Sequence, residues 1–359
     1  MTLFRTRALV AAALLAVVGL TAACGSSGEA ASAPSADPTA KAAELRLGFF
    51  ANVTHAPALV GLSEGFLTKN LGATKLSTQV FNAGPAAIEA LRSGSIDATY
   101  IGPSPSVNGF LQTKGEALRI VSGAASGGAQ LVVREGINNV ADLKGKTLAT
   151  PQLGNTQDVA LRAWLDENGL KTSVSSGGDV TITPTENATT LQLFRDGKID
   201  GAWLPEPWSS RLVLEAGAKV LVDEKTLWPE GKFVTTQLIV RTDFLNSYPG
   251  TVRDLLAANL ESVEFISANS EAAKKDTNNQ IDELTGKPLT QPTIDRAWPN
   301  LDFTYDPLAA SLQKSADDAV TAGTTKQGEL TGIYDLRLLN ALLAEQGKPA
   351  LGDAGLGQG

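Results

Sequence analysis

The chain repeats one motif at a spacing of 103 residues, and this internal repeat constrains the fold more than any other feature. The stretch GPAAIEALRSGSIDATYIGPSPS spans Gly84–Ser106, and NATTLQLFRDGKIDGAWLPEPW spans Asn187–Trp208. Arginine, glycine, isoleucine and aspartate recur in both copies, and each copy continues through a short apolar strand into a loop framed by prolines. A period this long corresponds to a domain rather than to a solenoid unit. The repeat therefore predicts two similar lobes that each present an equivalent loop to a shared cleft.

Strands and helices alternate in the same order in both halves of the chain. The patterns predict strands at 44–50, 76–81, 146–150 and 180–183, and helices at 58–66, 85–92, 157–168 and 188–195. Such alternation is typical of parallel sheets that carry helices on both faces. We therefore expect an α/β protein of two lobes, each a mostly parallel sheet flanked by helices, with the cleft between them.

A second repeat marks the places where the chain is expected to pass between the lobes. QLVVR at Gln130–Arg134 and QLIVR at Gln237–Arg241 agree in four of five residues and bracket the second unit. Two short aliphatic strands can also look alike by chance. We expect lobe one to comprise residues 44–129 and 236–350, with further helices at 244–248, 251–267, 306–322 and 335–346. Lobe two comprises residues 130–235, and residues 351–359 should fray.

The first 23 residues have the pattern of an export signal. Arg5 and Arg7 precede an apolar run at Ala8–Leu20, which is shorter than the ~20 residues that a membrane-spanning helix needs. Small residues then lead to Cys24, and this junction resembles the lipobox of bacterial lipoproteins, which implies lipidation of Cys24. The alternative is a plain secretory signal that precedes a cysteine. Residues 24–43 are rich in Ser, Ala, Pro and Gly and should form a flexible tether.

The composition excludes several classes of function. A net charge of −8 and a pI near 4.9 argue against nucleic-acid binding, which needs a basic surface. With one histidine, His55, and one cysteine, the chain lacks ligands for a structural zinc site, and any Ser-His-Asp triad would have to use His55. It also lacks a P-loop, a Gly-x-Ser-x-Gly elbow and a dinucleotide fingerprint. We expect a protein that is not an enzyme and uses no cofactor or metal.

The loops at the carboxyl ends of the predicted strands suit the capture of a small anion. Ligands bind at this edge of parallel sheets, where helix N-termini offer unpaired N–H groups and partial positive charge. Hydroxyl and amide side chains stand beside these helix starts, and glycines there allow close approach of the backbone. The candidate ligand-binding residues are His55, Asn82, Gly84, Pro103, Ser104, Ser106, Ser126, Gly128, Gln152, Asn155, Thr156, Glu206 and Trp208.

Several of these candidates also have structural interpretations. Ser104 and Ser106 are common turn residues, and Asn155-Thr156 can cap the helix that follows. His55 fits an exposed loop as well as a ligand site, and Trp208 fits either the core or the wall of the cleft. A carboxylate repels an anion, so Glu206 either binds an amine of the ligand or points away from it.

Four segments resemble the substrate-binding lipoproteins of ABC importers, and in particular those for aliphatic sulfonates, taurine and nitrate. These segments are FNAGP, ALRSGSIDATYIGPSP, VADLKGKTLAT and DGAWLPEPW, and the resemblance runs from about Glu44 to Val240. It implies a type II periplasmic-binding-protein fold that closes on its ligand by a hinge motion. It also places Pro103-Ser104-Pro105 where sulfonate binders carry a hydroxyl-bearing loop, with Gly154-Asn155-Thr156 opposite. Sulfonate binders often have a GDTPP-like loop where this chain has Gly102–Ser106, which leaves the ligand open.

The resemblance implies an exported, lipid-anchored, monomeric receptor at the outer face of the cytoplasmic membrane. Its partners would be a small organic anion, an ABC permease and the ATPase subunits of that permease. An aliphatic sulfonate or taurine is the favoured ligand class, with nitrate or a thiamine-pyrimidine precursor as alternatives. An enzyme of the pyrimidine-precursor synthase type is the alternative of another class, and a ligand-sensing lipoprotein is a third.

Overall fold

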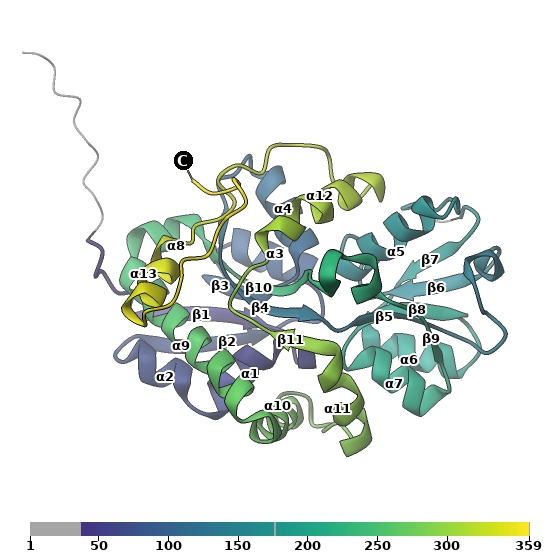
Figure 1. Cartoon of the computed structure of the whole chain (residues 1–359), viewed down its shortest axis with the longest axis horizontal. Helices are drawn as coiled ribbons and strands as arrows, with labels where there is room; N and C mark the ends of the chain where they lie inside the picture. The colour runs from purple at the N-terminus through teal and green to yellow at the C-terminus, as the bar shows by residue number, and fades with distance from the viewer. Residues whose placement is uncertain (1–36, 176, 359) are drawn as a thin grey trace, which may run out of the picture. The chain divides into compact units, whose positions relative to one another are not determined.

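The computed structural model describes residues 37–175 and 177–358 (Figure 1). The predicted export signal and Cys24 lie outside this part of the chain. Within it, no helix is both long enough and apolar enough to cross a membrane. Residues 40–42, which the sequence assigns to the tether, pack against the body of the protein: Ala42 is buried, and its N–H donates to Oγ1 of Thr251 at 2.8 Å.

The first lobe is built around a six-stranded sheet of order β11-β4-β10-β3-β1-β2. β1 pairs in parallel with β2 and β3, whereas β10 runs antiparallel between β3 and β4. The strands are β1 (Glu44–Phe49), β2 (Lys75–Val80), β3 (Ala98–Ile101), β4 (Leu118–Gly127), β10 (Val234–Arg241) and β11 (Leu301–Phe303). The helices of this part are α1 (Ala56–Ser63), α2 (Phe66–Leu71), α3 (Gly84–Arg92), α4 (Pro103–Gln112), α8 (Thr242–Ser247), α9 (Pro249–Ala268), α10 (Ser270–Thr285), α11 (Gln291–Ala297), α12 (Leu312–Thr321) and α13 (Arg337–Glu345).

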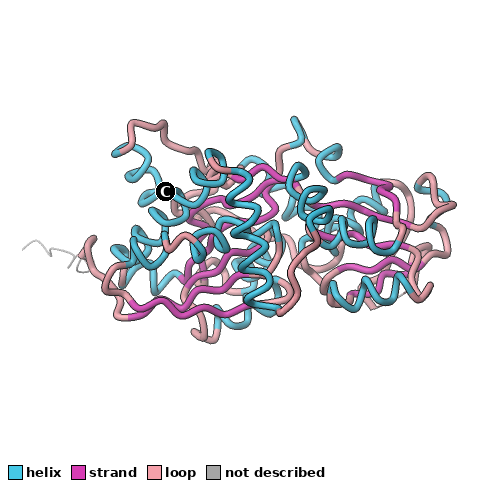
Figure 2. Tube along the Cα trace, turned by 90° about the horizontal axis from the view of Figure 1, so that it is seen from below, coloured by secondary structure: helices cyan, strands magenta, loops and turns pink. Residues whose placement is uncertain are grey.

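The second lobe is built around a five-stranded sheet of order β7-β6-β8-β5-β9. β6 pairs in parallel with β7 and β8, and β5 is antiparallel to β8 and β9. The strands are β5 (Ala129–Val133), β6 (Thr147–Thr150), β7 (Thr181–Pro184), β8 (Gly201–Pro205) and β9 (Lys219–Asp223), and the helices are α5 (Thr156–Glu167), α6 (Asn187–Arg195) and α7 (Trp208–Ala216). Figure 2 shows the strands of both sheets enclosed by helices. The two-lobed α/β fold is confirmed. Both sheets are mixed, because β10 and β11 run antiparallel to the other strands of the first sheet and β5 runs antiparallel to the other strands of the second.

The second sequence repeat forms two of these antiparallel strands and is not the crossing between the lobes. Gln130–Val133 lies in β5, which Arg134 follows directly, and Gln237–Arg241 lies in β10. The chain passes to the second lobe at Gly127 and Gly128, whose φ angles of 77° and 71° favour glycine. It returns through residues 224–233, between β9 and β10.

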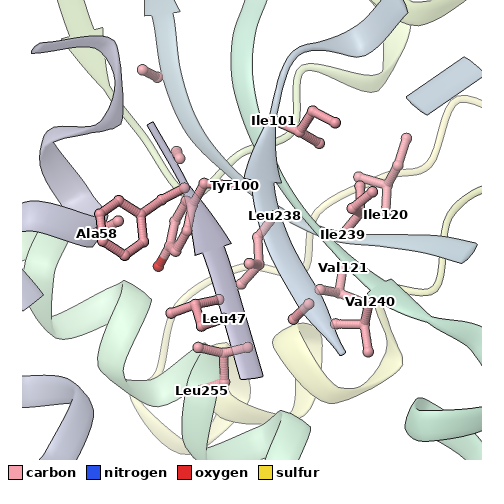
Figure 3. Close-up of a cluster of buried hydrophobic side chains, with 14 of the residues drawn as sticks. Leu47, Ala58, Tyr100, Ile101, Ile120, Val121, Leu238, Ile239, Val240 and Leu255 are labelled. Atoms are coloured by element: carbon pink, nitrogen blue, oxygen red, sulfur yellow. The ribbon is translucent and has the colours of Figure 1, made fainter. Parts of the chain in front are cut away.

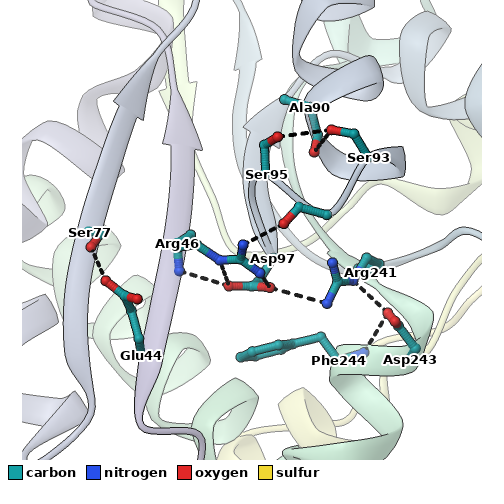
Figure 4. Close-up of polar contacts among 11 residues, drawn as sticks. Glu44, Arg46, Ser77, Ala90, Ser93, Ser95, Asp97, Arg241, Asp243 and Phe244 are labelled. Atoms are coloured by element: carbon teal, nitrogen blue, oxygen red, sulfur yellow. Dashed lines mark hydrogen bonds and ion pairs between the residues drawn. The ribbon is translucent and has the colours of Figure 1, made fainter.

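In each lobe, the aspartate of the Arg-Gly-Ile-Asp motif forms hydrogen bonds with the last residue of the QLVVR or QLIVR segment and with the neighbouring parallel strand. The N–H of Arg46 donates to Oδ2 of Asp97 at 3.0 Å, and the N–H of Arg241 donates to the carbonyl oxygen of Asp97 (Figure 4). In the second lobe, the N–H of Thr147 donates to Oδ2 of Asp200 at 2.9 Å, and the N–H of Arg134 donates to its carbonyl. The recurring aspartate therefore joins the parallel and antiparallel strands, which is a structural reason for the repeat.

Each lobe has its own hydrophobic core. The core of the first lobe is a single large cluster that includes Leu47, Tyr100, Leu238 and Leu255 (Figure 3). The second lobe has a smaller cluster on each face of its sheet, because successive residues of a strand point to opposite faces. The packing of these cores fixes the strand ends from which the candidate site is built.

Three local expectations are wrong. The predicted loop at Gly102–Ser106 is the start of α4, which begins at Pro103 because proline suits the first turn of a helix. The helix predicted at residues 58–66 ends at Ser63 as α1, and a short 3-10 helix at Val53–His55 precedes it. Asn155 occupies the N-cap position of α5, but its side chain makes no capping hydrogen bond.

Candidate functional site

A pocket lies where strand ends and helix starts of the two lobes face each other. The space among its lining residues that atoms do not fill is about 340 Å³, which includes space open to solvent. Among the described residues, its lining contains no lysine, arginine, aspartate or glutamate. The lining residues are Phe50, Asn52, Thr54, His55, Asn82, Gly102, Pro151, Asn155, Thr156, Gln157, Asn187, Pro205, Thr235 and Thr236.

The internal repeat places equivalent residues of both lobes in this pocket. Gly102 follows β3 and Pro205 ends β8, and these residues are 103 positions apart, like the two copies of the motif. Phe50 and Pro151 likewise follow the first parallel strand of each lobe. The pocket therefore lies between equivalent positions of the two lobes, at the carboxyl ends of their parallel strands, where α/β folds bind ligands.

Helix N-termini from both lobes supply the polar character of the pocket. Gly102 precedes α4, Asn155 and Thr156 start α5, and Asn187 starts α6. The first N–H groups of a helix have no partner within that helix, and the helix dipole makes this end partly positive. The pocket therefore offers hydrogen-bond donors and positive potential without a full positive charge.

Two buried polar atoms of the lining have no hydrogen-bond partner within residues 37–175 and 177–358. These are Oγ1 of Thr156 and Oδ1 of Asn187, in residues that are 8% and 7% exposed. A buried polar atom without a partner costs about 1–3 kcal/mol, so native proteins satisfy nearly all such atoms. Both atoms are therefore available to a group that enters the pocket.

A buried charge network holds the start of α5 in place. Oδ2 of Asp158 accepts hydrogen bonds from the N–H of Gly154 at 2.9 Å and from Nε of Arg162 at 3.0 Å, and Oδ1 accepts from the hydroxyl of Thr150 at 2.8 Å. Asp158 and Arg162 are fully enclosed. Because these bonds fix both the loop and the first turn of the helix, Thr156 is held rigidly at the pocket.

His55 lies in the pocket wall as a neutral side chain. It is 2% exposed, it stacks on Phe50 with ring centroids 4.3 Å apart, and burial lowers its pKa to about 3. The N–H of Phe50 donates to Nδ1 of His55 at 3.3 Å. Because Nδ1 accepts, the neutral imidazole carries its proton on Nε2, which makes Nε2–H a hydrogen-bond donor.

Asn155 bridges the two lobes. Its Oδ1 accepts from the N–H of Gly84, at the start of α3, at 3.0 Å, and its Nδ2 donates to Oε1 of Gln157 at 2.9 Å. Two further hydrogen bonds cross the cleft: Nδ2 of Asn82 to Glu186 at 3.2 Å, and Nε1 of Trp208 to Asn52 at 2.9 Å. The lobes are thus in contact around the pocket.

The structure brings four of the thirteen candidate residues into the lining, namely His55, Asn82, Asn155 and Thr156. Gly84 and Trp208 lie next to it through the bonds to Asn155 and Asn52. The remaining candidates are outside the lining. Pro103 and Ser104 lie in the first turn of α4, and the hydroxyl of Ser106 donates to the carbonyl of Gly102. The hydroxyl of Ser126 accepts from the N–H of Phe233. Gly128 lies at the crossing between the lobes, and Gln152 is exposed.

Glu206 points away from the pocket into a polar cluster of its own. It is fully buried, and Oε2 accepts from the N–H of Ser210 at 3.1 Å. Oε1 accepts from Nδ2 of Asn300 at 2.7 Å and lies 3.4 Å from Nη1 of Arg296. The carboxylate was expected either to bind an amine of the ligand or to point away from it, and the geometry matches the second role.

Sequence reasoning missed several lining residues. Asn187 was detectable, because it lies 103 residues after Gly84 and starts the equivalent helix. Thr235 and Thr236 belong to the return strand β10, and no sequence signal connects them to the loops of the motif. Asn52 lies within a predicted site loop but was not singled out.

Comparison with known proteins identifies the family. Residues 38–280 match the NMT1-like family. The chain belongs to this family. A putative binding protein of Brucella abortus is 27% identical over 256 residues, which cover 68% of this chain and 77% of the relative. A putative aliphatic sulfonates-binding protein of Bacillus subtilis is 25% identical over 341 residues, which cover 92% of this chain and 96% of the relative.

Solved structures share the fold. The alkanesulfonate-binding protein SsuA of Xanthomonas axonopodis pv. citri, bound to MOPS, superposes with a TM-score of 0.65 at 22% identity and covers 80% of this chain and 96% of its own. The resemblance to substrate-binding proteins of ABC importers is therefore confirmed for this NMT1-like chain. The relatives are named as binding proteins, which agrees with the expectation that the chain is not an enzyme.

Proposed function

We propose that this NMT1-like protein is the extracytoplasmic receptor of an ABC importer that captures a small organic anion, an aliphatic sulfonate, in the pocket between its lobes. The observation that carries the proposal is the unpartnered Oγ1 of Thr156 in an uncharged pocket lined by helix starts. A hydroxyl, helix N–H groups and a neutral imidazole suit an anion that has several acceptor oxygens. The names of the Bacillus subtilis and Xanthomonas proteins support the choice of sulfonate.

The hydrogen-bond donors of the pocket come from both lobes, which suits a receptor whose lobes close when the ligand binds. A sulfonate has three oxygens and can accept from His55 on one side and from Thr156 on the other. The amide of Asn187 can turn by 180° and present Nδ2 in place of the unpartnered Oδ1. Because an anion that joins both lobes binds the closed form better, it shifts the population toward that form.

The proposal extends to the partners and to the location. The closed receptor would deliver its ligand to a permease and ATPase subunits, and Cys24 would carry the lipid that anchors it at the outer face of the cytoplasmic membrane. We expect a Cys24→Ala variant to be released from the membrane while it retains ligand affinity. Membrane fractionation of producing cells tests this, and continued membrane association of Cys24→Ala would contradict lipid anchoring.

Calorimetric titration of the mature protein tests the ligand class. We expect saturable, one-to-one binding of methanesulfonate and propanesulfonate, and much weaker binding of nitrate. Binding of nitrate alone, or of a thiamine-pyrimidine precursor alone, would overturn the sulfonate proposal. If none of these compounds bound, the proposed role of the pocket in anion capture would be wrong.

A further inference from the structure

A second, larger hollow adjoins the ligand pocket, and we refer to it as the outer chamber. The space among its lining residues that atoms do not fill is about 1070 Å³, which includes space open to solvent. α6 and α7 of the second lobe form one wall, and α10 with the segment that follows it forms the opposite wall. Its lining residues are Ala51, Asn82, Ala188, Leu191, Gln192, Arg195, Pro207, Trp208, Arg211, Ile281, Thr285, Lys287 and Leu289.

The chamber shares part of its wall with the ligand pocket. Asn82 lines both spaces. Trp208 lines the chamber, and its Nε1 donates at 2.9 Å to Asn52, which lines the pocket. An organic anion with its acidic group among the helix starts can therefore extend its remaining atoms past Asn82 into the chamber.

The chamber combines an apolar wall with an excess of positive charge. Leu191, Trp208, Ile281 and Leu289 supply the apolar surface, while Arg195, Arg211 and Lys287 supply positive charge. No carboxylate lines the chamber among the residues that the structure describes. This differs sharply from the uncharged ligand pocket.

Two carboxylates near the chamber offset part of this charge. Glu215 pairs with both Arg195 and Arg211 at 2.7 Å, and Glu186 accepts from Asn82 at 3.2 Å. Lys287 forms no ion pair with any described residue, and it is exposed at the chamber wall. Lys287 is therefore the cation best placed to meet a group on a ligand.

We propose that the ligand carries a second acidic group at the end of a short apolar tail, and that the outer chamber recognises this group through Lys287 together with Arg195 and Arg211. This inference rests on the proposed function, since the tail is attached to the anion in the pocket. An ammonium group at the same place meets positive charge and no lining carboxylate, because Glu206 faces Asn300 and Arg296. The chamber therefore favours a sulfonate with a terminal carboxylate over taurine.

Three sulfonates with matched tails test the inference on the wild-type protein. 3-Sulfopropionate, propanesulfonate and taurine end in a carboxylate, a methyl and an ammonium group on the same two-carbon spacer. We expect calorimetry to rank their affinities in that order, with 3-sulfopropionate about three- to tenfold tighter than propanesulfonate at low salt. The difference should shrink at high ionic strength. 6-Sulfohexanoate and hexanesulfonate repeat the comparison of a terminal carboxylate with a terminal methyl group on a longer carbon spacer.

A pair of lysine variants locates the effect. Lys287→Gln should remove most of the preference for the terminal carboxylate and leave methanesulfonate affinity unchanged. Lys275→Gln, in an exposed lysine of α10 outside the chamber lining, should change neither. Equal affinities within both tail-matched pairs, or a preference that survives Lys287→Gln, would overturn the inference while methanesulfonate binding upholds the proposed function. Loss of all sulfonate binding would overturn both.

Discussion

At the scale of single residues, the candidate site depends on which polar side chains already have hydrogen-bond partners among the described residues and which do not. Thr156 has a buried hydroxyl without a partner, whereas Asn155 beside it is fully engaged with Gly84 and Gln157. The first is available to a ligand, and the second holds the lobes together. Adjacent residues with similar chemistry thus have different roles, and only their partners distinguish them.

Thr156→Val should weaken sulfonate binding by about tenfold or more without loss of stability. The substitution keeps the shape of the side chain and removes a hydrogen bond to a charged ligand, a bond worth about 1.5–3 kcal/mol. Thr277→Val is a matched control, because Oγ1 of Thr277 in α10 is also buried without a partner and lies away from the pocket. Calorimetry and urea unfolding of both variants check this. Equal sulfonate affinities of wild type and Thr156→Val would remove Thr156 from the site.

His55 should remain uncharged between pH 5 and pH 8. Burial lowers its folded-state pKa to about 3, below the ordinary value of 6.5. The unfolded chain therefore binds the extra proton first, so the contribution of His55 to stability is complete above pH 6.5 and falls as the pH drops toward 3. As the only histidine of the sequence, it gives a single imidazole signal in NMR of tag-free protein. Titration of that signal near pH 6.5 would contradict this placement.

At the scale of the elements, the repeated motif braces each sheet. Asp97 and Asp200 occupy equivalent positions, yet their surroundings differ. The carboxylate of Asp97 is 1% exposed and pairs with Arg46 at 2.5 Å and Arg241 at 3.3 Å. The carboxylate of Asp200 is 31% exposed and lies 3.9 Å from the ammonium group of Lys146.

Neutralising Asp97 should therefore reduce the free energy of unfolding more than neutralising Asp200. We expect Asp97→Asn to reduce the free energy of unfolding by about 3 kcal/mol, because it leaves two arginines without their buried counter-charge. Asp200→Asn should cost about 1 kcal/mol or less, since its ion pair is long and partly hydrated. Urea unfolding of both variants measures the difference. Equal losses would show that the brace acts through the backbone bonds that both lobes share.

At the scale of the whole molecule, a buried polar cluster joins the lobes near the crossing. Arg296 of α11 donates to Ser210 of α7 at 2.7 Å and to Gln130 of β5 at 3.1 Å, and it pairs with Glu206. Asn300 donates to the same carboxylate at 2.7 Å. Because its members belong to both lobes, the cluster stabilises the arrangement in which the ligand pocket is closed.

Arg296→Met should lower the affinity for every sulfonate by the same factor. Removal of the guanidinium leaves Glu206 buried with less compensation, which costs about 3 kcal/mol in comparable pairs and weakens the closed form. Methanesulfonate and 3-sulfopropionate should lose affinity equally, in contrast to Lys287→Gln. Arg253→Met, which breaks an exposed pair with Glu345, is the control. A loss confined to 3-sulfopropionate would instead assign Arg296 to the outer chamber.

The repeat and the hydrophobic periodicity predict the two-lobed α/β fold and the edge of the sheets at which the pocket lies. Both are local signals, and strand ends follow from them directly. Which polar groups line the pocket follows only from how distant parts of the chain pack together. Thr235 and Thr236 arrive on a strand that returns from the second lobe, and two of the partners of Glu206, Arg296 and Asn300, lie about 90 residues further along the chain. The direction of a side chain depends on packing against distant residues, which local patterns do not encode.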